Sequence, residues 1–163
     1  FIGLGIRTIR LTGGEPLIQQ NPLTPLLRHL KDGGFWIEVE TNGTIVPGKK
    51  LLEIVDHWSV SPKLENSGNS LPAREEPEAY RFFRNLPSAH FKYVVERPDD
   101  LAEVRALSKK YKLSPDRIVL MPQARDRNTL LDKSGWLVDI CKSEGYIFST
   151  RLQVLLWGNR RGV

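Results

Sequence analysis

Apolar segments of two kinds alternate along the chain. Short runs rich in Ile, Val and aromatic residues are typical of buried strands, whereas Leu23, Leu26, Leu27 and Leu30 recur at the spacing of one helix face. The pattern predicts six strands, at residues 7–11, 36–40, 58–60, 91–95, 118–121 and 151–157. It predicts helices at residues 22–31, 49–55, 78–85, 99–111 and 129–144.

This order of elements predicts an α/β fold. Strands that alternate with helices at this spacing run parallel and are joined by right-handed crossovers. Six mostly parallel strands are too few for a closed eight-stranded barrel, so they predict an open sheet or a partial (β/α) barrel. We expect one domain over residues 1–163, in which the polar segment 64–77 is a loop or insertion. Asn21 is the expected N-cap of the first helix, and Gly145 ends the last one.

Polar residues follow several of the predicted strands, at residues 12–16, 40–44, 61–63 and 121–123. The carboxyl ends of parallel strands meet at one edge, where α/β folds bind ligands, so these segments predict one shared site. Strand ends are also polar simply because they meet water. That explanation accounts poorly for a glycine pair, or for Glu40, a carboxylate that follows Ile37 and Val39 on a central strand.

The first of these segments, Thr12-Gly13-Gly14-Glu15-Pro16, carries the sharpest signal. Two glycines without Cβ atoms let the backbone lie against a ligand, and a carboxylate follows at once. Proline then fixes φ and ends the turn. The arrangement suits a small ligand that bears an ammonium group. By contrast, Asn-Gly at residues 42–43 is a common turn dipeptide and is expected to be structural.

Composition limits the binding partners and the cellular compartment to be expected, but it does not indicate a reaction. The net charge is +5 with a pI of about 9.5, yet Lys and Arg are spread along the chain, so a solvated surface is the ordinary interpretation. No apolar run approaches the roughly 18–20 residues that cross a bilayer. Cys141 is the only cysteine and is expected to be a buried thiol, in a cytoplasmic protein. His29, His57 and His90 lack metal-ligand spacing and are expected to be structural.

Five motifs, in this order, resemble those of the radical S-adenosylmethionine (SAM) enzymes: Thr-Gly-Gly-Glu-Pro, Glu-Thr-Asn-Gly-Thr, Ser-Pro-Lys, Lys-Tyr-Val-Val and Leu-Met-Pro-Gln. The closing stretch RLQVLLWGNRRGV narrows the resemblance to the 7-carboxy-7-deazaguanine synthases of queuosine and deazapurine biosynthesis. The resemblance covers residues 12–163. It implies a partial (β/α) barrel of the radical SAM type that uses SAM, a [4Fe–4S] cluster and Mg²⁺.

The implied reaction converts 6-carboxy-5,6,7,8-tetrahydropterin to 7-carboxy-7-deazaguanine with loss of ammonia. In this family the reduced cluster cleaves SAM to a radical that removes a hydrogen from the pterin, and a ring contraction follows, so the cofactor carries the hard step. The resemblance therefore implies a carbon–nitrogen lyase without an identified catalytic side chain. It also implies an electron donor such as flavodoxin or ferredoxin, a homodimer, and no direct contact with nucleic acid or membrane.

The resemblance assigns roles to residues at the strand ends. Gly14, with its two neighbours, is expected to receive the methionine ammonium of SAM. Val163 is expected to offer its free carboxylate to the N–H groups of the pterin, because a carboxylate only accepts hydrogen bonds. The residues assigned to SAM are Gly13, Gly14, Glu15, Ser61, Pro62, Lys63, Met121, Pro122, Gln123 and Ala124. Those assigned to the substrate are Thr12, Glu40 and Val163.

The chain departs from the family pattern at its N-terminus. The family holds its cluster with three cysteines in a CxxxCxxC loop, and iron–sulfur clusters need such thiolates. Cys141 cannot replace them, and the Mg²⁺ ligand beside that loop is missing as well. We therefore expect an N-terminally truncated sequence whose cluster ligands precede Phe1, and a chain that is inactive by itself.

Two other functions stay open at this point. The first is another radical SAM enzyme, such as a glycyl-radical activating enzyme, which shares the GGEP motif but not the Trp-Gly-Asn-Arg-Arg-Gly-Val ending. The second is a non-catalytic module that binds anions or RNA, which only the basic pI suggests. Steep salt dependence of RNA binding would support the second.

Overall fold

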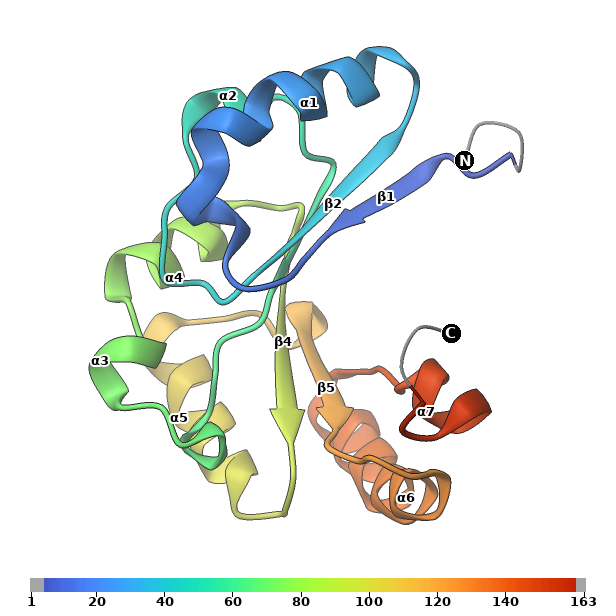
Figure 1. Cartoon of the computed structure of the whole chain (residues 1–163). Coiled ribbons are helices and arrows are strands. Elements are labelled where there is room, and N and C mark those ends of the chain that lie inside the picture. Colours follow the sequence, from blue (N-terminus) through green and yellow to red (C-terminus); the bar gives the residue numbers. More distant parts are fainter. Residues whose placement is uncertain (1–4, 161–163) are drawn as a thin grey trace. The chain divides into compact units, whose positions relative to one another are not determined.

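The computed structural model describes residues 5–160, which belong to two compact units (Figure 1). The first unit comprises Phe1–Pro62 and Pro72–Ala89. The second comprises Lys63–Leu71 and His90–Val163. Each unit contains parallel strands and the helices that cover them, and each is described by itself below.

The first unit is built on three parallel strands in chain order. They are β1 (Thr8–Leu11), β2 (Trp36–Thr41) and β3 (His57–Val60). The connecting helices are η2 (Pro16–Gln19), α1 (Gln20–Asp32), α2 (Lys49–Leu52) and, after β3, α4 (Pro77–Asn85). Helix α1 packs against β2 and α2 (Figure 1).

The core of this unit lies on the helix-covered face of its strands. Ile37 and Val39 of β2 are almost fully buried, as is Trp58 of β3. The Trp58 ring contacts Phe83 of α4, with 5.7 Å between ring centroids. Because side chains alternate along a strand, burying these positions places Glu38 and Glu40 on the opposite face of β2.

The second unit repeats the pattern with β4 (Ala89–Val95), β5 (Ile118–Pro122) and β6 (Ile147–Phe148), again parallel and in chain order. Its helices are η3 (Glu65–Ser67), α5 (Asp100–Tyr111), η4 (Pro115–Arg117), α6 (Arg127–Glu144) and α7 (Leu152–Trp157). Short helix α3 (Leu71–Arg74) begins at the boundary between the units. Alternate residues of β4 and β5 are buried, so each strand has one covered and one half-exposed face.

Five predicted strands are confirmed within two residues, but the sixth is wrong. Residues 151–157 contain helix α7, in which the amides of Val154 and Leu155 both donate to the Arg151 carbonyl. The sixth strand is instead β6, which pairs with β5 directly after Gly145 ends α6. A short apolar run without strict alternation fits a strand or a helix equally well, and tertiary packing decided between them.

Helices α1 and α2 also differ from the prediction, and the segment 64–77 predicted as a loop or insertion contains η3 and α3. Helix α1 begins at Gln20, so Asn21 lies inside it and is not the N-cap. The reason is that η2 runs directly into α1, and the cap belongs to Glu15 at the start of η2. Helix α2 ends at Leu52 rather than at residue 55. Among the described residues, no helix is long and apolar enough to cross a membrane.

Candidate functional site

Glu15 organises the carboxyl ends of the strands in the first unit. Its side chain is 9% exposed, and its Oε1 accepts hydrogen bonds from the Leu17 amide at 3.0 Å and the Thr41 hydroxyl at 2.9 Å. Its Oε2 accepts from the Asn42 amide at 2.6 Å. The same carboxylate thus caps η2 and ties the loop after β1 to the end of β2. Pro16 follows it at the first position of η2, where a missing N–H costs nothing.

The turn after β2 is held by its own side chains. The Asn42 Oδ1 accepts from the Thr44 amide at 2.9 Å and from the Thr44 hydroxyl at 2.6 Å, as in an Asx turn. Gly43 has φ +76°, and a Cβ on it would lie 2.8 Å from Val60 Cγ1. The structural role predicted for Asn42 and Gly43 is confirmed.

The glycine pair beside Glu15 lies in open space. Gly13 and Gly14 have φ of +98° and +53°, values that favour glycine. A Cβ at either position would meet nothing within 4 Å. Thr12, immediately before them, is exposed as well. The backbone here can be approached by a ligand, and the reason for glycine is conformation rather than crowding by the protein.

Ser61 and Pro62 follow β3 and are buried. The Ser61 amide donates to the Thr41 carbonyl at 2.7 Å, which continues the pairing of β2 with β3. Through Thr41, Ser61 is joined to Glu15, so the structure links two predicted residues, from the ends of β1 and β3.

A row of charged residues in the first unit was missed by the sequence analysis. Arg10, Glu38 and His57 are register partners on β1, β2 and β3. Arg10 Nη2 lies 2.9 Å from Glu38 Oε2, and His57 Nδ1 lies 3.6 Å from Glu38 Oε1. The Trp36 ring stacks on His57 with 5.9 Å between centroids. Glu38 shares a face with the predicted residue Glu40, so the alternation along β2 was the signal that could have found it.

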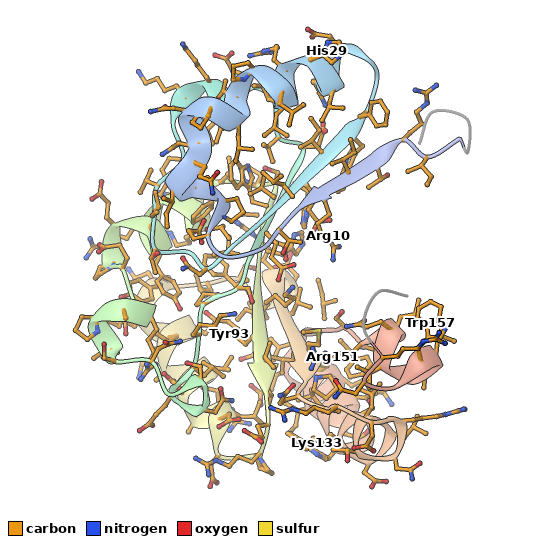
Figure 2. The ribbon with its side chains drawn as sticks, viewed as in Figure 1. Arg10, His29, Tyr93, Lys133, Arg151 and Trp157 are labelled. Atoms are coloured by element: carbon orange, nitrogen blue, oxygen red, sulfur yellow. The ribbon has the colours of Figure 1, made fainter. Side chains whose placement is uncertain are left out.

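The charges in this row explain how Glu38 is kept ionised while buried. Burial opposes ionisation, but the His57 contact and the nearby Arg10 guanidinium outweigh it, so the pKa of Glu38 lies below its ordinary value of 4.5. Figure 2 labels Arg10 on β1.

In the second unit, the end of β5 carries the other predicted SAM-binding residues. The Gln123 amide donates to the Val95 carbonyl at 2.7 Å and extends the pairing with β4. Arg151 Nη1 donates to Gln123 Oε1 at 2.6 Å and to the Ala124 carbonyl at 2.9 Å. Ala124 is buried with Leu130 and Val154.

The remaining predicted residues fall in different surroundings. Met121 is half-buried and Pro122 is buried on β5, whereas Lys63 is exposed at the start of the second unit. Glu40 is half-buried on β2. Val163 lies outside the described residues. The ligand roles assigned to all these positions stay predictions.

No group of three or more His, Cys, Asp or Glu side chains in the described residues could hold a metal ion. Cys141 is buried, and this burial, with a smaller effect of Glu144, raises the pKa of its thiol. It is the buried thiol that the sequence predicts.

Relatives of known name match almost the whole chain. The 7-carboxy-7-deazaguanine synthase of Pyrobaculum aerophilum is 36% identical over 153 residues, which cover 93% of this chain and 66% of the relative. The synthase of Rhodopirellula baltica is 31% identical, over 97% of this chain and 64% of the relative. The chain belongs to the 7-carboxy-7-deazaguanine synthase family. It spans about two thirds of the length of these family members. No protein-family model matches it.

Solved structures agree with this family assignment. QueE from Escherichia coli is 26% identical, with a TM-score of 0.63 over 89% of this chain and 56% of that protein. A domain of the pyruvate-formate lyase-activating enzyme from Bacteroides vulgatus has a TM-score of 0.61 over 87% of this chain and 97% of that domain. At 13% identity this second likeness shows the fold alone. The predicted α/β fold of the radical SAM type is confirmed.

Proposed function

We propose that the protein converts 6-carboxy-5,6,7,8-tetrahydropterin to 7-carboxy-7-deazaguanine with loss of ammonia, as a carbon–nitrogen lyase that uses SAM. The observation that carries this proposal is 36% identity to a named synthase across 93% of the chain. The pterin, an electron donor such as flavodoxin or ferredoxin, and a second copy of the protein are the partners that the proposal includes. The product would enter queuosine or another deazapurine pathway.

The strand ends of the first unit fit the methionine part of SAM. Gly13 and Gly14 expose backbone that a ligand can approach, because a Cβ at either would meet only open space. A carboxylate has about four acceptor sites, and Glu15 already accepts three hydrogen bonds. Glu15 therefore shapes the loop first, and its Oε2 keeps one site for an ammonium group. Bound SAM would supply the radical chemistry, while these residues hold and orient it.

Further predicted contacts complete this proposal. Ser61, Pro62 and Lys63 follow β3, and the segment from Met121 to Ala124 lies at the end of β5. Each is a strand end of the kind at which α/β folds bind nucleotides. Thr12, Glu40 and the carboxylate of Val163 are the residues proposed for the pterin. A carboxylate at Glu40 suits the N–H donors of an aminopyrimidine edge.

The described residues do not fit the metal cofactors. A [4Fe–4S] cluster needs several thiolates, and the chain has one cysteine, which is buried. No cluster of metal-ligating side chains is found in residues 5–160 that could take Mg²⁺.

Activity is tested with the complete coding sequence, expressed anaerobically and supplied with iron, sulfide, SAM and a reductant. Formation of 7-carboxy-7-deazaguanine from the carboxytetrahydropterin, followed by mass spectrometry, is the expected result. Turnover of SAM without that product would overturn the proposed substrate but leave a radical SAM enzyme. Absence of both would overturn the proposed function.

The SAM site is tested by Gly14→Ala, with Gly68→Ala as its matched control. Both glycines have positive φ, and a Cβ at either meets open space, so both variants carry a similar backbone strain of about 1 kcal/mol. We expect Gly14→Ala to weaken SAM binding at least tenfold in calorimetry, because the methyl group enters the ligand's space. Gly68→Ala should bind SAM as the wild type does. Equal affinities in the two variants would contradict the assignment of Gly14.

The two other candidate functions receive less support. A glycyl-radical activating enzyme shares the fold at 13% identity, whereas the deazaguanine synthases share sequence at more than 30%. An anion- or RNA-binding module rests only on a basic pI.

A further inference from the structure

Arg151 connects the start of the last helix to the predicted SAM-binding end of β5. Its Nη1 donates to Gln123 Oε1 at 2.6 Å and to the Ala124 carbonyl at 2.9 Å, across 28 and 27 positions in sequence. Its own carbonyl accepts from the amides of Val154 and Leu155 in the first turn of α7. Figure 2 shows Arg151 at one end of α7 and Trp157 at the other.

These contacts fix which way the Gln123 amide faces. An arginine has only donors, so the atom of Gln123 that faces Nη1 must be the carbonyl oxygen and not the NH₂ group. The main chain of Gln123 is held separately, because its amide donates to the Val95 carbonyl. With backbone and Oε1 both held, the two Nε2 hydrogens point away from the guanidinium as a donor pair of set orientation.

Apolar packing holds the other side of this connection. Val154 of α7 is buried against Ala124 and Leu130, and Leu155 packs on the same cluster. Among the described residues, the hydrogen bonds given for the guanidinium go to an amide oxygen and a main-chain carbonyl, and its buried Nε has no hydrogen-bond partner there. Arg151 therefore spends its hydrogen bonds on orienting the strand end rather than on a surface ion pair.

We propose that Arg151 is a positioning residue that makes Gln123 a hydrogen-bond donor toward an acceptor atom of the bound nucleoside. The acceptor is a ring nitrogen or a ribose oxygen of SAM, so this inference rests on the proposed function. Arg151 itself does not touch the ligand; it acts through Gln123. If Arg151 were only structural, it would stabilise α7, and SAM affinity would not depend on whether residue 123 carries an amide or a carboxylate.

Gln123→Glu distinguishes a positioning role of Arg151 from a purely structural one. The glutamate keeps an oxygen opposite Arg151 and adds a charge of opposite sign, so the thermal midpoint of the full-length, cluster-loaded protein should stay equal or rise. The donor pair is replaced by an acceptor, so the SAM dissociation constant should rise about tenfold. Pterin binding, measured without SAM, should not change. Unchanged SAM affinity in this variant would overturn the proposal, and so would a loss of folding.

Arg151→Gln and Arg151→Lys give the second measurement. Lysine keeps the charge but offers no planar fork, so it should recover only part of the SAM affinity that glutamine loses. Arg125→Gln is the control, because Arg125 lies exposed one residue after Ala124 and its loss changes the charge equally. If SAM affinity falls equally in Arg125→Gln and Arg151→Gln, the loss comes from the changed net charge, and the proposal is overturned.

A variant that fails to fold can be distinguished from a wrong proposed function. If Arg151→Gln does not fold, the Gln123→Glu result decides alone. If the wild type binds no SAM, the proposed function has failed rather than the role of Arg151.

Discussion

The two units hold their strand ends with opposite chemistry. In the first, a buried acceptor, Glu15, receives two backbone amides and a hydroxyl. In the second, a half-buried donor, Arg151, gives one nitrogen to a side-chain and a backbone oxygen. Buried amides without a partner are costly, so Glu15 is needed for folding of its loop. Arg151 holds only two groups, and one of them is the end of the long Gln123 side chain. It is therefore better suited to adjusting a ligand contact.

Glu15→Ala removes the hydrogen-bond acceptor of the first unit, and we expect it to lose more stability than the other variants. The substitution leaves the Leu17 and Asn42 amides without their acceptor, which should lower the free energy of unfolding by about 3 kcal/mol. Chemical denaturation measures the loss, and hydrogen exchange should localise it to the first unit. Glu15→Gln keeps one acceptor oxygen and should lose less.

Glu53→Ala is the matched control for this substitution. Glu53 forms an exposed ion pair with Arg28, at 3.1 Å, and such pairs contribute about 0.5 kcal/mol or less. A Glu15 variant no less stable than the Glu53 variant would show that the loop finds other acceptors.

The contribution of Glu38 to the stability of the first unit depends on pH. Because the pKa of folded Glu38 is lowered from 4.5, its contribution is complete above pH 4.5 and is lost as pH falls through the lowered value. We expect Glu38→Gln to cost about 1 kcal/mol near neutral pH, a modest figure because Arg10 is largely exposed. The difference from wild type should shrink in denaturation curves toward pH 3. A constant difference would show that the carboxylate's charge contributes nothing.

Tyr146 tests the second unit at alkaline pH, with the smallest expected effect. Burial, helped by Glu144, raises the pKa of Tyr146 from 10.0 to about 12. Its contribution is therefore complete below pH 10 and is lost as pH rises toward 12. Tyr146→Phe should cost about 0.5 kcal/mol near neutral pH, and the cost should fall above pH 10. A phenol that ionises near pH 10 in the ultraviolet titration of the folded wild type and is missing from that of Tyr146→Phe would contradict this.

The fold was readable from the sequence wherever a local pattern had one meaning. Buried and half-buried residues alternate strictly along β4, apolar and acidic residues alternate at positions 37–40 of β2, and Gly145 ends α6 with φ +73°. Residues 151–157 carry no such alternation, and the strand predicted there is a helix. Its identity depends on Val154 reaching Ala124 and Leu130, which are remote in sequence.

The candidate site divides in the same way. Gly14 and Glu15 were predicted to bind a ligand because a glycine pair and a following carboxylate are local signs of a ligand loop. Glu38 was missed because its partners Arg10 and His57 come from neighbouring strands in register. Arg151 was missed because nothing nearby in sequence indicates its bond to Gln123.

Periodicity, turn residues and ordered motifs are properties of neighbouring positions, so the α/β class, five of the strands and the family could be predicted from the amino-acid order. Which polar groups pair with one another depends on the folded chain: Glu15 with the Asn42 amide, Arg151 with the Gln123 oxygen, and Arg10 with the Glu38 carboxylate. A buried polar atom takes whichever partner the packed chain brings within hydrogen-bond distance, and that distance does not depend on separation in sequence.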